Sequence, residues 1–184
     1  MNDAAQTKAL AVARITCGAR ETVQMERVNN ILRHEAYQWH LRKNEAAEEH
    51  RIFCHHDMAH FLDVARIAMI FNLKEKLGIP QEVVYGAALL HDIGRHEQYE
   101  NGTPHEAASA RIAPDILADC GYGPEEIQEI TAAIALHRDS ETAQRQDLAG
   151  ILYRADKAGR ACFSCRVSGQ CNWKEDRKNQ RISW

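Results

Sequence analysis

The sequence lacks the features that mark several large classes of protein. It has only four prolines in 184 residues, and no stretch alternates convincingly between apolar and polar residues, so nothing predicts a β-sheet. No apolar run approaches the roughly 20 residues that span a bilayer. The opening residues, MNDAAQTKAL, show neither the basic nor the long apolar segment of a secretory signal. We therefore expect an all-α protein of the cytoplasm, without a membrane partner.

A strong charge of either sign is also absent. The chain carries 23 Lys and Arg against 26 Asp and Glu, a net charge of −3 with histidine neutral. This balance gives no reason to expect nucleic acid as a partner. The length and a hydrophobic fraction of 45% fit a soluble protein with one sizeable core. Composition thus predicts one compact domain overall.

Helical periodicity covers most of the chain. Gly78 and Pro80 end one helix, and Pro114 predicts a kink or break within another. Residues 95–104 and 138–146 are polar and predict loops. The segment from Thr22 predicts one long amphipathic helix or two, which could pack against a second copy in a homodimer. The expected helices cover about residues 1–20, 22–51, 56–77, 80–94, 105–120, 124–137 and 147–160.

Two polar residues stand at an unusual place in this pattern. In AALLHDIG, His91 and Asp92 directly follow four apolar residues, at the end of a helix that we expect to be buried on most sides. Burying two such groups costs free energy unless each finds a partner, and a metal ion suits both.

Other histidines and an aspartate also fall at predicted helix ends. His105 begins a helix, His137 and Asp156 end largely apolar stretches, and His56 and His60 are four residues apart on one helical face. Imidazole with carboxylate suits Mn, Fe, Co or Zn, and the lack of a thiolate here argues against a closed structural zinc site. Taken singly, a histidine at a helix end is more often a cap or a surface residue. We assign that plainer role to His34, His40, His50 and His55.

The order of these motifs carries a resemblance. HFLDVARIA, ALLHDIG and YRADK resemble the ordered His, His-Asp and Asp signature of the HD-domain superfamily of metal-dependent phosphohydrolases, over residues 52–160. The resemblance implies an HD-domain helical bundle. Residues 1–51 would be an N-terminal helical extension packed on it, and residues 161–184 a Cys-rich C-terminal tail. The ligands implied for one metal are His60, His91, Asp92 and Asp156.

Two further histidines extend the resemblance to members that hold two metals. His105 and His137 lie between the His-Asp pair and the last aspartate, as in the bacterial diadenosine-tetraphosphate hydrolases and the cyclic-dinucleotide phosphodiesterases of this superfamily. The Gly-Tyr-Pro signature of the latter is absent. Asp92 would then bridge two ions, with Fe or Mn the metals that we expect. His56 stays open as an additional ligand, as a Glu is in some trinuclear members.

The activity implied by the resemblance is hydrolysis of a phosphoric ester or anhydride. The substrate would be a nucleotide or another small phosphorylated molecule, attacked by a metal-bound hydroxide. Asp92 would serve catalysis through the metals, while Arg95 and then Lys157 would hold phosphate. Arg138 and His96 are weaker candidates, and any of these cations could be an ordinary surface charge. Two other functions stay open: a non-catalytic nucleotide- or redox-sensing HD module, and a di-iron oxygenase.

The cysteines pose a separate question. Cys162, Cys165 and Cys171, in CFSCRVSGQC, have the spacing C-x2-C-x5-C. Cys54 could add a fourth thiol if the tail folds back near His55. In a reducing cytosol such thiols favour metal binding over disulfides, with Zn or an iron–sulfur cluster as the soft-ligand choices. Reduced thiols that pack against the last helix fit the pattern equally well.

Overall fold

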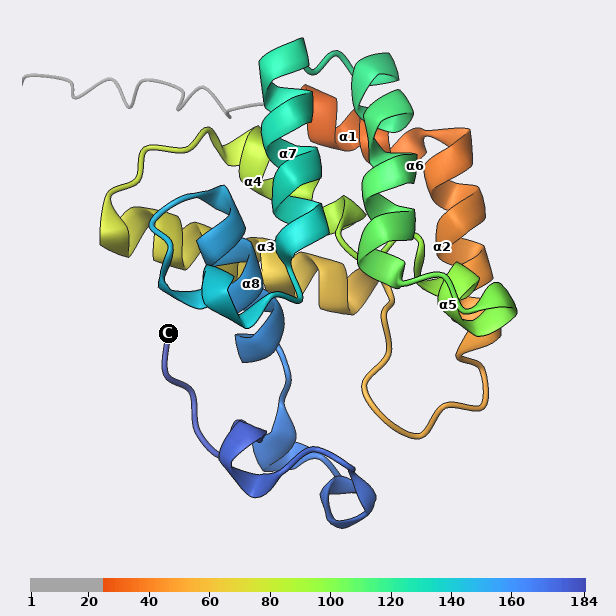
Figure 1. The fold of residues 1–184 in the computed structure, drawn as a ribbon, viewed down its shortest axis with the longest axis vertical. Coiled ribbons are helices and arrows are strands. Elements are labelled where there is room, and N and C mark those ends of the chain that lie inside the picture. Colours follow the sequence, from red (N-terminus) through yellow and green to blue (C-terminus); the bar gives the residue numbers. More distant parts are fainter. Residues whose placement is uncertain (1–24) are drawn as a thin grey trace, which may run out of the picture.

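Helices form all the regular secondary structure of residues 25–184, the part of the chain that the computed structural model describes (Figure 1). The all-α prediction is confirmed there, and the predicted helix over residues 1–20 lies outside it. None of the described helices is long and apolar enough to cross a membrane. The elements are α1 (Glu26–Arg33), α2 (Glu35–Ala47), α3 (Met58–Glu75), α4 (Gln81–Leu90), α5 (Arg95–Asn101), α6 (His105–Asp119), α7 (Pro124–Leu136), η1 (Ser140–Gln144), α8 (Leu148–Ala158), η2 (Cys162–Ser164), η3 (Ser168–Gln170) and η4 (Glu175–Arg177), the η elements being short 3-10 turns.

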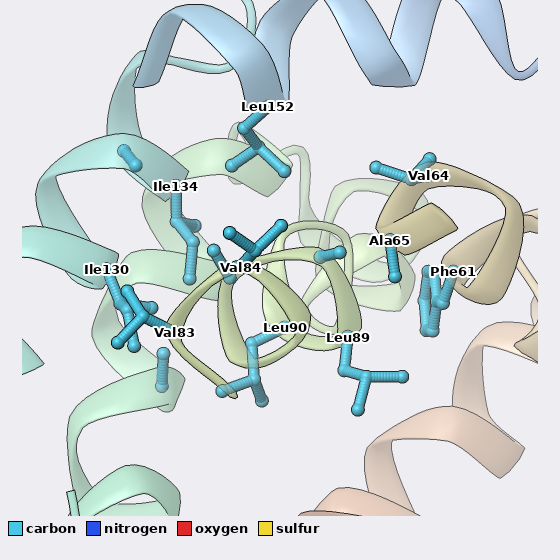
Figure 2. Close-up of a cluster of buried hydrophobic side chains, with 14 of the residues drawn as sticks. Phe61, Val64, Ala65, Val83, Val84, Leu89, Leu90, Ile130, Ile134 and Leu152 are labelled. Atoms are coloured by element: carbon cyan, nitrogen blue, oxygen red, sulfur yellow. The ribbon is translucent and has the colours of Figure 1, made fainter. Parts of the chain in front are cut away.

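Helix α4 lies at the centre of the bundle and contacts α1, α3, α6, α7 and α8. Its near-continuous apolar sequence is buried on most sides, as predicted, with Leu89 and Leu90 fully covered. Burial of a leucine or valine side chain contributes roughly 1.5–3 kcal/mol, so α4 is firmly held and fixes the residues that follow it. Figure 2 shows α4 nearly end-on, surrounded by Phe61, Val64 and Ala65 of α3, Ile130 and Ile134 of α7 and Leu152 of α8.

The segment after residue 24 forms two helices. His34 has an extended conformation, with φ −66° and ψ 128°, which separates α1 from α2. The buried residues of α1, Val28 and Ile31, belong to the main core, and α1 packs on α4. Helix α2 packs on α1 and α5. A homodimer through this segment stays a prediction.

Residues 95–101 form helix α5, where the sequence predicted a loop. The prediction was wrong because it relied on apolar residues at helical spacing, and RHEQYEN has none. The residue that α5 buries is polar: His96 is 2% exposed. Gly94 is the N-cap of α5, and Gly102, with φ +80°, ends it in the left-handed conformation that glycine adopts without strain. The preceding helix stops earlier, at Leu90.

Helix α6 continues through Pro114, so of the predicted kink or break the break is absent. Proline removes one helical hydrogen bond. Ala113 before it and Ile116 and Leu117 after it are buried in the bundle, and this packing holds the helix together across the proline.

Residues 161–184 form an irregular tail beyond one end of the bundle (Figure 1). No hydrophobic residue of the tail is fully buried: Phe163, Trp173 and Ile182 are exposed, and Trp184 is partly buried against the main core. Its attachment to α8 is polar. The amide nitrogen of Asn179 donates to the carbonyls of Lys157, Ala158 and Arg160 at 2.8, 3.2 and 2.9 Å.

Candidate metal centre

The predicted ligands converge because each sits at or near the end of a helix packed on the core. His60 lies in the first turn of α3, where its backbone N–H donates to the N-cap Asp57 at 3.0 Å. His105 is the first residue of α6. His91 and His137 are the C-caps of α4 and α7, and Asp156 lies in the last turn of α8.

One group of ligand atoms consists of His60, His91, Asp92 and Asp156, all within 4.8 Å of one another. His60 Nε2 is 3.5 Å from Asp156 Oδ1 and 3.9 Å from Asp92 Oδ2. His91 Nε2 is 3.4 Å from Asp92 Oδ2 and 4.0 Å from Asp156 Oδ1. Two imidazoles and two carboxylates therefore face one point.

A second group consists of Asp92, His105 and His137, again within 4.8 Å. The Nε2 atoms of His105 and His137 lie 3.1 and 3.3 Å from Asp92 Oδ1. Asp92 thus turns Oδ2 to the first group and Oδ1 to the second, so its carboxylate stands between two possible ion positions.

His91 and His137 are oriented in the same way. The Nδ1 of His91 lies 2.7 Å from the carbonyl of Ala88, and that of His137 lies 2.6 Å from the carbonyl of Ile134. A carbonyl can only accept, so each Nδ1 carries the proton and each Nε2 has a free lone pair. This arrangement is the usual one for a histidine that binds a metal.

The buried polar atoms of the site fit a cation. Among the described residues, buried side-chain atoms without a hydrogen-bond partner include the Nε2 of His60, His91 and His137 and the Oδ1 of Asp92. Leaving one such group unpaired costs about 1–3 kcal/mol. Three such nitrogens around one carboxylate, whose Oδ1 is itself without a hydrogen bond, suit a metal, which supplies the partner that the protein does not.

The electrostatics of the site also call for positive charge. Burial alone would raise the pKa of Asp92, but the imidazoles of His91 and His56 hold it well below its ordinary value. Burial would likewise lower the pKa of His91, yet Asp92 raises it. At His60, burial and then His91 dominate and lower the pKa to about 4. The ionised carboxylates and the neutral His60 are ready to bind a cation.

Glu48 is a buried residue of the site that the sequence did not single out. It follows α2 with its side chain 2% exposed, and its carboxylate accepts from His56 Nδ1 at 2.6 Å and from the Tyr99 hydroxyl at 2.6 Å. Burial would raise the pKa of Glu48, but the hydrogen bond and charge of His56 lower it to about 2. Glu48 therefore stays ionised and orients His56.

His56 lies beside the two groups without joining either. His56 precedes the N-cap Asp57 and lies outside α3. The prediction that His56 and His60 share a helical face was therefore wrong. The Nε2 of His56 nevertheless points inward, 3.7 Å from Asp92 Oδ2.

The turn that carries His91 and Asp92 is fixed by two contacts that the sequence also did not reveal. The buried amide of Asn44 donates to the Asp92 carbonyl at 2.9 Å and accepts from the His96 backbone N–H at 2.7 Å. Gly94 donates to Ser109 Oγ at 2.9 Å. A Cβ on Gly94 would lie 2.7 Å from the backbone nitrogen of Ser109, so only glycine fits there.

The candidate phosphate-binding residues lie at different places. The guanidinium of Arg95 is 2.5 Å from His105 Nδ1, and its Nε is buried without a hydrogen bond. The ammonium of Lys157 contacts the Asp156 carboxylate. Arg138 is half exposed and pairs with Glu106 at 3.5 Å. His96 contacts no predicted ligand: its Nε2 is 2.9 Å from His40 Nδ1.

Of the histidines given a plainer role, none belongs to either ligand group. His50 and His55 are exposed, and His34 pairs with Asp119 at 3.2 Å. The other predicted site, made of thiols, lies around one cavity of about 360 Å³ beside His60. The cavity is lined by Cys54, Cys162, Cys165 and Cys171.

Comparisons with known proteins place this all-α, His- and Asp-lined bundle in a family. Residues 57–161 match the HD domain. An uncharacterized protein of Clostridium beijerinckii is 46% identical over 158 residues, which are 86% of this chain and 99% of the relative. The chain belongs to the HD domain family.

Two further similarities agree with this assignment. A Bacillus subtilis protein named "Putative phosphohydrolase YueE" is 32% identical over 101 residues, 47% of this chain and 57% of that protein. The crystal structure of a predicted HD superfamily hydrolase from an uncultured Thermotogales bacterium superposes with a TM-score of 0.59 and 26% identity, over 80% of this chain and 81% of that one.

Proposed function

We propose that this protein is a metal-dependent phosphohydrolase or phosphodiesterase with a binuclear centre. The observation that carries the proposal is the position of Asp92, whose Oδ2 faces His60, His91 and Asp156 while its Oδ1 faces His105 and His137. A carboxylate placed in this way is suited to bridge two cations. The family, and the hydrolase names of two similar proteins, support hydrolysis as the activity.

The donor set favours iron or manganese. It contains imidazole nitrogens and carboxylate oxygens without a thiolate, and ligands of this type suit Fe and Mn among the divalent metals. When bound, two such ions would make water a nucleophile near neutral pH and neutralise charge on a phosphoryl group.

The protein's own cations would position the substrate. Arg95 lies at the edge of the second ligand group. Its Nε is buried without a hydrogen bond, 4.0 Å from the Glu48 carboxylate, and a guanidinium binds phosphate oxygens in a fixed planar geometry. Lys157, beside Asp156, is 29% exposed and can reach outward from the first group. The substrate that these groups suit is a nucleotide or another small phosphorylated molecule.

The proposal is tested by metal analysis combined with a phosphate-release screen over nucleotides and phosphodiesters, with Mn or Fe added. The wild type should hold two ions per chain at the His/Asp centre, beyond any iron bound with labile sulfide, and release phosphate from at least one compound. Asp92→Ala should lose both ions and all turnover, whereas His137→Ala should lose one ion. Asp115→Ala, an exposed aspartate of α6, is the matched control. An Asp92→Ala protein that keeps two ions and full activity would refute the proposal.

A second candidate is a di-iron oxygenase. The second ligand group, His105, His137 and Asp92, has the two-imidazole, one-carboxylate composition of many non-haem iron oxygenases. Oxygen consumption by the iron-loaded protein, without phosphate release from any compound, would favour it. Tight nucleotide binding without turnover would instead favour the sensing module.

A further inference from the structure

We infer that Cys54, Cys162, Cys165 and Cys171 bind an iron–sulfur cluster of the [4Fe–4S] type, in the cavity between the tail and the loop before α3. The site is separate from the His/Asp centre, and the inference does not depend on the proposed hydrolase activity.

The first argument is the meeting of distant thiols. Cys54 lies in the loop between α2 and α3, and the other three lie in the tail, more than one hundred residues later, yet all four line one cavity of about 360 Å³. The fold therefore brings four cysteines from segments far apart in the sequence to the same cavity.

The second argument is that the tail has no hydrophobic core. The tail's one hydrophobic contact with the main core is the partly buried Trp184 at its far end, and its regular structure consists of three short 3-10 turns. Short segments of this kind need a disulfide or a metal to hold one fold. A cluster bound by Cys54 and by the tail would join the tail to the bundle, because metal binding supplies folding free energy directly.

The third argument is the charge around the cavity. Lys178, whose side chain is 4% exposed, lines it, with its ammonium 2.8 Å from the carbonyl of Ser168. Arg160 also lines it and lies over the Trp173 ring at 4.2 Å. Asp57 and Asp63 line the cavity as well. The Lys178 ammonium pairs with Glu175, so the lining is close to balanced in charge. Four thiolates give a cluster a net negative charge, and Lys178 and Arg160 are the cations of the lining that offset it. Each thiol would release its proton on binding.

No three of the four sulfur atoms lie within 4.8 Å of one another, which favours a cluster over one zinc ion. In the described part of the chain, only the two groups at the His/Asp centre bring three or more ligand atoms within 4.8 Å of one another. Four thiolates on zinc must lie about 3.8 Å apart, since each Zn–S bond is about 2.3 Å. A [4Fe–4S] cluster separates its thiolates further, because each binds a different iron. Thiols spread around a cavity suit the larger group.

The cluster would also support the His/Asp centre. His60 and Cys54 lie on either side of the N-cap of α3, and Asp156 and Cys162 on either side of the end of α8. A cluster in the cavity would therefore link the helix ends that carry His60 and Asp156.

The test measures acid-labile sulfide, which the His/Asp centre does not contain. The full chain is prepared as Asp92→Ala, to remove iron bound at that centre, and reconstituted without oxygen using iron salts, sulfide and dithiothreitol. We expect about four iron and four sulfide per chain, as the cluster type requires, and a visible absorption band that bleaches with dithionite. This background also keeps a failure here distinct from a failure of the proposed hydrolase activity.

Two cysteine variants and a control complete the design. Cys54→Ala and Cys165→Ala, one from each side of the cavity, should each lose the sulfide and the band while the helical circular dichroism persists. Cys120→Ala should keep both, because Cys120 is buried at the end of α6 and does not line the cavity. Absence of labile sulfide after reconstitution, one zinc per chain in its place, or sulfide retained in both cysteine variants would each overturn the inference.

Discussion

The His/Asp centre and the cysteine tail hold their ligands in opposite ways. The ligands of the centre sit at the ends of helices packed on α4, and His91 and Asp92 are at most 2% exposed. The thiols of the tail are half-buried or exposed, on a segment without a core. In the bundle, packing positions the ligands before any ion binds. In the tail, the bound group would have to fix the fold.

This difference is visible in the glycines of the two regions. A Cβ on Gly94 would lie within 2.8 Å of three atoms of Ala108 and Ser109, whereas a Cβ on Gly169 of the tail would meet nothing within 4 Å. The space around the His-Asp turn is filled by neighbouring backbone, and the space around the tail is open. Mutations should therefore cost more in the first region than in the second.

Among residues outside the two ligand groups, the largest effect is expected from Glu48→Ala. The change removes the carboxylate that accepts from His56 Nδ1 and the Tyr99 hydroxyl. The His56 imidazole, 15% exposed, then loses the partner that orients it. Loss of such an orienting partner costs about 10–100-fold in metal affinity or activity. Competition with a chelator, followed by phosphate release, measures both. Glu49→Ala, at the exposed neighbouring position, should match the wild type, and equal metal affinity in the two variants would contradict a role for Glu48.

A smaller effect on stability is expected from a pair of glycine variants. Gly94→Ala should lower the free energy of unfolding by about 1–3 kcal/mol, since overpacking forces backbone to move. Gly169→Ala should stay within about 0.5 kcal/mol of the wild type, as surface changes usually do. Urea denaturation measures both. Equal losses would show that the two regions are packed alike.

The helices and the inward-facing ligands could be predicted because they leave a pattern in the sequence. An apolar run that ends in a polar residue marks a buried helix end, and His91 and His137 both occupy such ends. That ligands from distant segments converge could be predicted only from the order of the motifs, which resembles that of a known superfamily. No local pattern states that His60 and Asp156 lie 3.5 Å apart.

The supporting residues could not be predicted because their burial is a tertiary effect. Glu48 and Asn44 lie in the polar run KNEAAEEH and become buried only when that segment packs against the His-Asp turn. Helix α5 was missed for a related reason, since its buried residue is a histidine. Hydrophobic periodicity detects helices that pack through apolar side chains. It does not detect helices or turns that pack through buried polar side chains.

The smallest effect concerns acid stability, which should belong to the bundle because the tail has no histidine. Burial, followed by the neighbouring His96, lowers the pKa of His40 from 6.5 to about 4, with Glu97 opposing and Arg111 adding to the shift. Above pH 6.5, His40 is neutral in both folded and unfolded chains and contributes nothing. Between pH 6.5 and 4 the unfolded chain binds the proton more readily, so the free energy of unfolding falls as the pH falls.

His40→Gln should make this fall shallower in urea denaturation at successive pH values. His50→Gln, at an exposed position, should leave it unchanged, and an identical slope in the two variants would mean that the His40–His96 contact does not carry the acid sensitivity.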